Sequence, residues 1–62
     1  MRFVLEVNFD TETMQEQPLE QLQHVLRSLA NHIELYPMEH GVEGEVFDTR
    51  HEGVGEWALL DD

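Results

Sequence analysis

The stretch from residue 18 to about residue 36 carries the strongest periodic pattern in the chain and constrains its fold most. Apolar residues recur there every three or four positions, which is typical of one face of an α-helix. They are Leu19, Leu22, Leu26, Leu29, Ile33 and Tyr36, with Val25 and Ala30 widening the stripe. The pattern predicts one amphipathic helix whose apolar face closes the core of the domain.

The ends and the polar face of this helix follow from neighbouring residues. Pro18 fits the first helical position, where its missing N–H costs nothing, and the proline holds Gln17 outside the αR region as the N-cap residue. Pro37 cannot continue a helix, so it should end near residues 34–36. The polar face is nearly neutral and comprises Gln21, Gln23, His24, Arg27, Ser28, Asn31 and His32.

Residues 2–10 alternate between apolar and polar side chains, which predicts a strand with one buried face. The residues expected to face the core are Phe3, Leu5, Val7 and Phe9. Those expected to face outward are Arg2, Val4, Glu6, Asn8 and Asp10. Residues 11–17 are polar without periodicity, so we expect a connecting loop there.

A hairpin is predicted after the helix. Residues 38–42 form a loop with Gly41 as its turn residue, and strands follow at residues 43–50 and 54–60. Between them, Glu52-Gly53 supplies a residue that tolerates positive φ. We expect Val46, Trp57 and Leu59 to face inward and Glu45 and Glu56 to face outward, whereas Phe47 fits either face.

The element order is therefore β-α-β-β, in a single domain spanning residues 1–62 of the α+β class. If the third strand lies between the first two, every neighbouring pair is antiparallel and the sheet order is 1-3-2. Trp57 then lies on the central strand under the helix, where a large ring buries most area. One helix covers one face of the three-stranded sheet, and the other face stays open to solvent.

The charge balance limits the functions that such a domain can have. Fourteen Asp and Glu residues face only three Arg and no Lys, which gives a formal net charge of −11 at pH 7. Direct binding to nucleic acid or to anionic lipid is disfavoured, since both need a basic surface. The charge favours solubility, a basic protein partner or a metal cation.

Other composition signals point to a soluble protein. Cysteine is absent, which excludes disulfides and thiolate metal sites, and no run of 18 apolar residues could span a membrane. The N-terminus lacks the features of a signal peptide. We expect a monomeric, cytoplasmic protein.

Catalytic and metal-binding motifs are lacking. The candidate nucleophiles Ser28, Thr11, Thr13 and Thr49 sit in no glycine-rich elbow and beside no evident base. The histidines His24, His32, His40 and His51 form no H-x-x-x-H or H-E-x-x-H pair. We therefore expect no catalytic residues, no metal and no cofactor.

The candidate functional residues are acidic. Same-face neighbours on a strand lie roughly 6.6 Å apart, so acidic strands present a rigid array of negative charge. Such a surface either keeps a small protein soluble or mimics the phosphate backbone and occupies a basic nucleic-acid channel in another protein. The predicted partner-binding residues are Glu6, Asp10, Glu43, Glu45, Asp48, Glu52 and Glu56.

An alternative function uses apolar contacts. A small adaptor or regulatory module could bind a protein partner through the open sheet face, with Val4, Phe47 and Leu60 as its contacts. An exposed apolar patch among the acids would favour the adaptor, and a uniformly negative face would favour the mimic of the phosphate backbone.

One resemblance bears on the choice. A short strand, then P-x-x-x-L-x-x-V-L-R-x-L-A from Pro18 to Ala30, then G-E-V-x-D-x-x-x-x-G-V-G-E-W from Gly44 to Trp57, resembles small β-α-β-β proteins of bacteriophages and mobile elements. Those proteins often carry Asn-Gly at the turn, where this chain has Glu52-Gly53. Class membership, rather than any shared functional residue, implies an inhibitor. The best-known class of small acidic phage proteins comprises anti-CRISPR and anti-restriction proteins. We expect an anti-CRISPR that binds the Cas proteins of a type I surveillance complex and blocks DNA binding.

Overall fold

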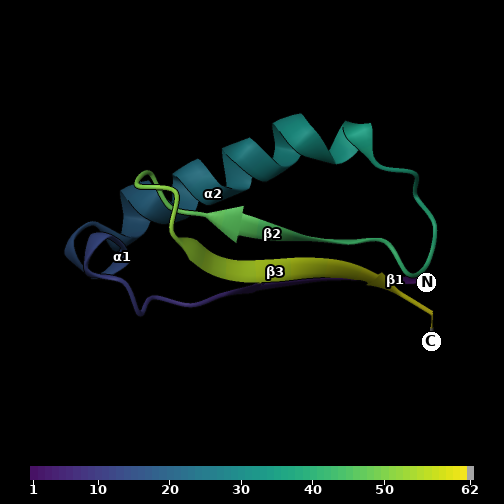
Figure 1. Cartoon of the computed structure of the whole chain (residues 1–62), viewed down its shortest axis with the longest axis horizontal. Coiled ribbons are helices and arrows are strands. Elements are labelled where there is room, and N and C mark those ends of the chain that lie inside the picture. Colours follow the sequence, from purple (N-terminus) through teal and green to yellow (C-terminus); the bar gives the residue numbers. More distant parts are fainter. Residues whose placement is uncertain (62) are drawn as a thin grey trace.

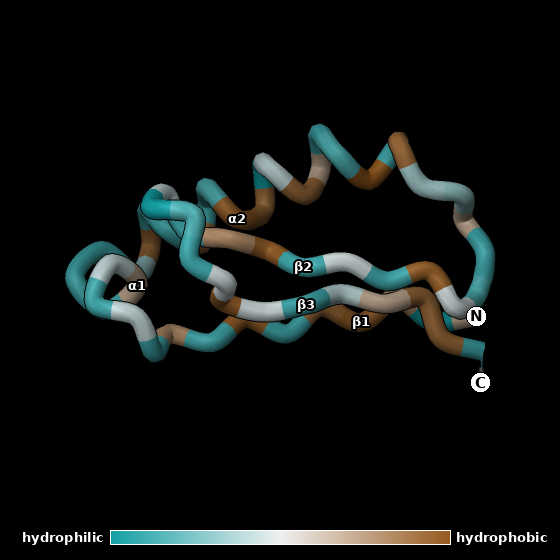
Figure 2. The backbone as a smooth tube through the Cα atoms, in the orientation of Figure 1, coloured by the Kyte–Doolittle hydropathy of each residue, from teal (hydrophilic) through white to brown (hydrophobic). Residues whose placement is uncertain are grey.

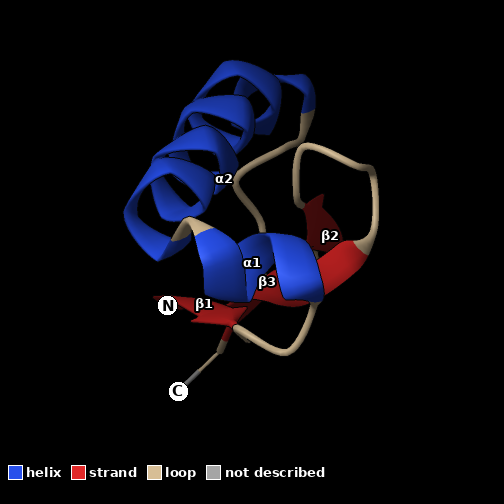
Figure 3. Ribbon diagram, turned by 90° about the vertical axis from the view of Figure 1, so that its left-hand side faces the viewer, coloured by secondary structure: helices blue, strands red, loops and turns tan. Residues whose placement is uncertain are grey.

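The three strands form one antiparallel sheet in the order β1-β3-β2, with the main helix across one face (Figure 1, Figure 3). A computed structural model describes residues 1–61. The elements follow the order β1 (Arg2–Val7), α1 (Glu12–Glu16), α2 (Pro18–His32), a 3₁₀ turn η1 (Ile33–Leu35), β2 (Glu43–Phe47) and β3 (Gly53–Leu60). The predicted α+β fold, its β-α-β-β order and the strand order 1-3-2 are confirmed.

The main helix begins and ends where the prolines predict. Gln17 occupies the N-cap position of α2 in a non-helical conformation (φ −137°, ψ 65°), and Pro18 is the first helical residue. Regular helix ends at His32 and tightens into the 3₁₀ turn η1 before Pro37.

The buried line of α2 differs from the predicted apolar stripe. Gln21 and Val25 are buried, and Leu29 is half-buried along the same line. Leu19 and Leu26, in contrast, are 64% and 46% exposed. The prediction that the whole stripe closes the core is therefore wrong, because a three-stranded sheet covers only one side of so wide an apolar arc. Figure 2 shows apolar positions recurring along α2 above the sheet.

Gln21, which was predicted to lie on the polar face, joins α2 to the β2–β3 turn. Its Nε2 donates to Thr49 Oγ1 and its Oε1 accepts from the Thr49 N–H, both at 3.1 Å. These two hydrogen bonds satisfy both ends of a buried amide, which is what allows glutamine at a core position. They also fix which side of α2 faces the sheet.

The segment 11–17 was predicted to be a loop, and this prediction is wrong. Thr11 caps the short helix α1 by accepting a hydrogen bond from the Met14 N–H on its Oγ1 (3.2 Å). Met14 is fully buried and joins the core. One apolar residue in a polar segment shows no periodicity, so the element could be found only from its cap.

The core is built around Trp57 on the central strand, as predicted. It is made by Met14, Val25, Val46, Val54 and Trp57. Phe3 stacks on the indole at a centroid distance of 5.8 Å, and Tyr36 meets it edge-on at 5.2 Å. Both covering rings remain partly exposed at the end of the molecule opposite α1. Strand β1 ends at Val7, so Asn8, Phe9 and Asp10, which were predicted to belong to the strand, lie beyond it. Phe9 is 38% exposed, and the prediction that it faces the core is wrong.

The β2–β3 turn uses a different residue from the predicted one. His51, with φ 63°, takes the left-handed conformation, whereas Gly53 begins β3 at an ordinary φ. Gly41 has φ 93°, as its predicted turn role requires. A bulge near Phe47 leaves Val54 as an extra residue in β3, and Val54 is buried. This irregularity changes the face on which residues near the turn lie.

Replacing His51 with glycine is expected to stabilise the fold by about 0.5–1 kcal/mol, because glycine removes the left-handed strain and loses only part of that gain to chain entropy. The matched control is Gly53→Ala, where the added methyl meets only Glu45 Oε2, at 3.6 Å. Urea unfolding measures both variants. A Gly53→Ala variant that loses more stability than any other turn substitution would contradict this assignment.

Candidate functional site

Three glutamates form one row across the open face of the sheet. The strand register places Glu6 opposite Glu56, and Glu56 opposite Glu45. All three side chains are exposed. Directly opposite residues in antiparallel strands have Cβ atoms about 4.5–5.5 Å apart, so the carboxylates are close neighbours. We call Glu6, Glu56 and Glu45 the glutamate row.

The glutamate row works against folding. Like charges directly opposite one another destabilise a sheet, and the register brings no cation into the row. Beside it lies a shallow hollow of about 300 Å³ that also includes the backbone of Gly53 and Gly55. The exposed carboxylates of the glutamate row flank this backbone and remain accessible to a partner.

The remainder of the open face is less acidic. The next row across the sheet is Val4, Ala58 and Glu43, and the last pair is Arg2 and Leu60. Val4 and Leu60 are each 38% exposed. The face therefore combines a negative band near the β2–β3 turn with an apolar patch toward the far end of the sheet.

Phe47 does not join this apolar patch. It follows the bulge at the end of β2, is partly exposed, and lines a groove on the helix side of the sheet. The three apolar contacts considered for an adaptor are thus split, with Val4 and Leu60 on one face and Phe47 apart from them.

Asp48 is not available to a partner, because it is fully buried. Its Oδ1 accepts from the N–H groups of Arg50 (2.9 Å) and Glu52 (3.0 Å), and its Oδ2 accepts from the Thr11 hydroxyl (3.0 Å). Burial by itself would raise the pKa of Asp48, but these hydrogen bonds and the Arg50 charge outweigh it and hold the pKa below the ordinary 3.8. Asp48 is a structural carboxylate that ties α1 to the β2–β3 turn.

The other predicted acidic residues are exposed. Glu43 lies on the open face two positions before Glu45 in β2. Glu52 belongs to the β2–β3 turn, and Asp10 precedes Thr11, whose hydrogen bond to Asp48 brings it to that same end of the sheet. The structure thus gathers Glu6, Glu43, Glu45 and Glu56 on one face, with Asp10 and Glu52 at its end.

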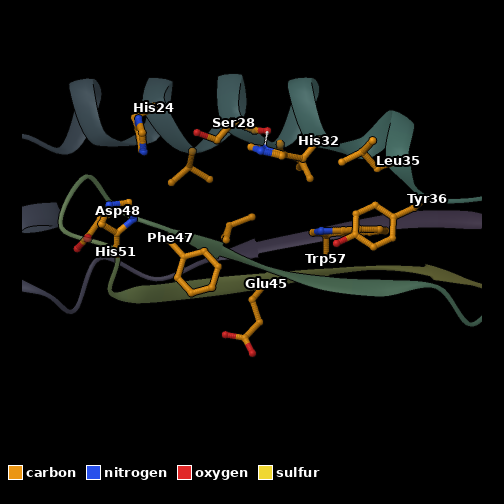
Figure 4. A pocket seen from close by; sticks show the side chains of 13 residues that line it. His24, Ser28, His32, Leu35, Tyr36, Glu45, Phe47, Asp48, His51 and Trp57 are labelled. Atoms are coloured by element: carbon orange, nitrogen blue, oxygen red, sulfur yellow. Dashed lines mark hydrogen bonds between the residues drawn. The ribbon is translucent and has the colours of Figure 1, made fainter.

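A groove between α2 and β2 was not predicted from the sequence. It has a volume of about 390 Å³, and Val25, Leu29 and Val46 form its apolar floor. His24 and His32 project toward it from α2, two turns apart (Figure 4). Their spacing on one helix face was the available sequence signal. Within residues 1–61, no three His, Cys, Asp or Glu side chains converge in a way that could hold a metal ion.

Comparison with protein-family models, curated proteins and solved structures yields no match. Within residues 1–61, no helix has both the length and the apolar character needed to cross a membrane. Function must therefore be inferred from the surface of this chain and from the chemistry of its exposed residues.

Proposed function

We propose that this protein is a non-enzymatic inhibitor that binds a basic, nucleic-acid-binding surface of another protein through the open face of its sheet. The observation that carries the proposal is the glutamate row, where the register sets Glu6, Glu56 and Glu45 side by side. The fold gains no stability from this repulsive arrangement. A basic partner would relieve this repulsion, and the relief would add to the binding free energy.

The electrostatics of the whole chain support a basic partner. A net charge of −11 on 62 residues creates a negative field that steers positively charged proteins toward it. Lysine is absent, so the field is interrupted only by three arginines. A channel built to hold the phosphate backbone presents the complementary positive charge.

The target class follows from the resemblance to small phage proteins. We propose an anti-CRISPR activity in which the glutamate row occupies the DNA-binding channel of a type I surveillance complex formed by Cas proteins. Target DNA is then excluded by direct competition for the same basic residues.

A second candidate function is supported by the apolar patch on the same face. Val4 and Leu60 are each 38% exposed, and Ala58 lies opposite Val4 and two positions before Leu60 in β3. An adaptor would use this patch as the centre of a protein interface, with the acids as its rim. The two functions differ in which rows of the sheet carry the binding free energy.

Charge reversal by Glu45→Lys with Glu56→Lys is expected to weaken binding to a purified type I surveillance complex by roughly 100-fold, since unlike pairs become like pairs. Competition against labelled target DNA at increasing salt measures the affinity of each variant for the complex. In the wild type, affinity should fall at least about tenfold between ~50 and ~300 mM salt. The matched control is Glu20→Lys with Glu34→Lys, which makes the same charge change on α2 and η1.

Three results would overturn the inhibitor proposal. The first is that the wild-type protein neither binds the complex nor competes with DNA. The second is that both double variants lose affinity equally, which would show a dependence on net charge alone. The third is that Val4→Ser with Leu60→Ser abolishes binding while the charge reversal does not, which would establish the adaptor.

A further inference from the structure

Strand β2 is an edge of the sheet, and half of its backbone groups point away from β3. The Leu59 N–H donates to the Val42 carbonyl (2.9 Å) at the start of the pairing. Hydrogen-bonded pairs alternate along antiparallel strands, so Gly44 and Val46 direct their backbone groups at β3. Glu43 and Glu45 consequently direct their N–H and C=O groups outward, where a further strand could pair with them.

The side chains of β2 alternate in the same way. Val46 is buried in the core beneath α2, and Gly44 faces Trp57 on that same side. Glu43 and Glu45 are exposed on the open face. The groove between α2 and β2 runs along this edge on the core side (Figure 4). At about 390 Å³ it lies within the range of roughly 300–1,000 Å³ found for ligand pockets.

We propose that β2 receives an extended peptide segment with alternating apolar and basic side chains as a fourth strand of the sheet. Such a strand would lie about 4.7–4.9 Å from β2 and pair with the outward groups of Glu43 and Glu45. Its apolar side chains enter the groove above Val25 and Leu29. Its basic side chains lie on the open face beside Glu43 and Glu45, where the charges are complementary.

The inference rests on the proposed function for the basic character of the partner and adds the mode by which that partner is held. Charge decides against a second copy of this chain as the occupant. Each copy carries −11, and pairing two β2 edges would bring Glu43 and Glu45 close to their own counterparts. A basic segment instead neutralises both glutamates.

The test uses the full chain made by chemical synthesis with a methyl group on the Glu45 nitrogen. This change deletes one outward N–H and keeps the carboxylate. The matched control carries the methyl group on the Leu5 nitrogen of β1. Asn8 N–H donates to Val54 O, so by alternation Leu5 points its N–H outward at the opposite edge. The probe is a capped heptapeptide of alternating lysine and valine. Its binding is measured by the fluorescence of Trp57, the single tryptophan.

The alternating peptide is expected to bind at least about tenfold more tightly than a heptapeptide of the same composition with its valines grouped, because only alternation fills the groove and the acidic face together. The methyl group on the Glu45 nitrogen should lower the affinity for the alternating peptide at least about tenfold, and the methyl group on the Leu5 nitrogen should change it little. A second pair of variants fills the groove. Ser28 lines the groove, so Ser28→Phe should weaken binding of the alternating peptide. Gln23→Phe, on the exposed side of α2, should leave that binding unchanged.

Four outcomes would overturn the proposal. They are equal binding of the two peptides, equal effects of the two methyl groups, no binding of either peptide, and a dimer of the protein that dissociates only when the Glu45 nitrogen is methylated. The proposed function has a separate readout. If the Glu45 methyl leaves binding to the surveillance complex intact while charge reversal abolishes it, strand addition fails and the inhibitor proposal stands.

Discussion

Gly55→Ala is expected to unfold the protein. A Cβ at this position would lie 1.9 Å from the backbone carbonyl oxygen of Glu6 and 3.0 Å from the Val7 Cα. Backbone atoms of a paired strand cannot turn aside, so β1 would have to leave β3. We expect a loss of about 4 kcal/mol or more, against a total stability of about 3–5 kcal/mol for a domain of this size.

Two other glycines calibrate this result by circular dichroism and urea unfolding. Gly53→Ala, in the same strand, should fold normally, because only Glu45 Oε2 at 3.6 Å lies near the new methyl. Gly44→Ala should fall between them, since its methyl would meet the Trp57 side chain at 2.6 Å, and a side chain can shift more readily than backbone. A folded Gly55→Ala variant would show that β1 and β3 are not paired as described.

Asp48→Asn is expected to cost about 1–2 kcal/mol at pH about 7, because the charge that strengthens three hydrogen bonds is removed while the shape of the side chain is kept. Asp48→Ala should cost more, since the N–H groups of Arg50 and Glu52 and the hydroxyl of Thr11 all lose their acceptor. Urea unfolding followed by Trp57 fluorescence gives both values.

The pH dependence of this difference has a definite sign. The pKa of Asp48 is lower in the folded protein than its ordinary 3.8, so the folded state binds the proton less readily than the unfolded chain. The stability that the carboxylate supplies is therefore complete above the ordinary pKa and is lost as pH falls through the folded pKa. The gap between wild type and Asp48→Asn should be constant from pH ~7 to ~5 and close below pH ~4.

Subtracting the two stability curves isolates Asp48 from the other carboxylates. Those groups are the same in both proteins, so their contribution cancels in the difference. A gap that stays open at the lowest accessible pH would indicate that shape rather than charge is what Asp48 contributes. A gap that widens on acidification would mean that its folded pKa is raised.

The architecture could be predicted because strong local signals agree with one another. Pro18 and Pro37 bracket the helix, Gly41 marks a turn, and alternation in residues 2–10 indicates the first strand, which in the structure ends at Val7. A short hairpin after a helix leaves few sheet orders, and an all-antiparallel order is consistent with the central placement of Trp57. Each of these features is visible within a few residues of sequence.

Two of the errors concern polar groups whose partners are distant in sequence. Gln21 was assigned to the surface because its partner Thr49 is 28 positions away, and Asp48 because its bond to Thr11 spans 37. The helix α1 depends on Met14 reaching a core that only the folded chain provides. Local patterns cannot show that a polar side chain has a buried partner.

The acidic residues of the candidate site could be predicted from the sequence, but their arrangement in one row could not. Alternation alone placed Glu6, Glu45 and Glu56 outward, and the structure keeps all three exposed. That they share one row depends on the register of two strand pairs, which the sequence left open. The groove beside β2 was missed altogether, since it is lined by residues of α2, β2 and β3 that come together only in the folded chain.

The packing of Gly44 against the Trp57 side chain helps to set the register of β2 against β3, and with it the position of the glutamate row. Glycine is the one residue that fits below the indole, and its neighbours along β2 are Glu43 and Glu45. If β2 slipped by one residue against β3, a glutamate side chain would collide with the ring and a charge would enter the core. The indole therefore selects one register of the hairpin. In that register Glu45 lies beside Glu56.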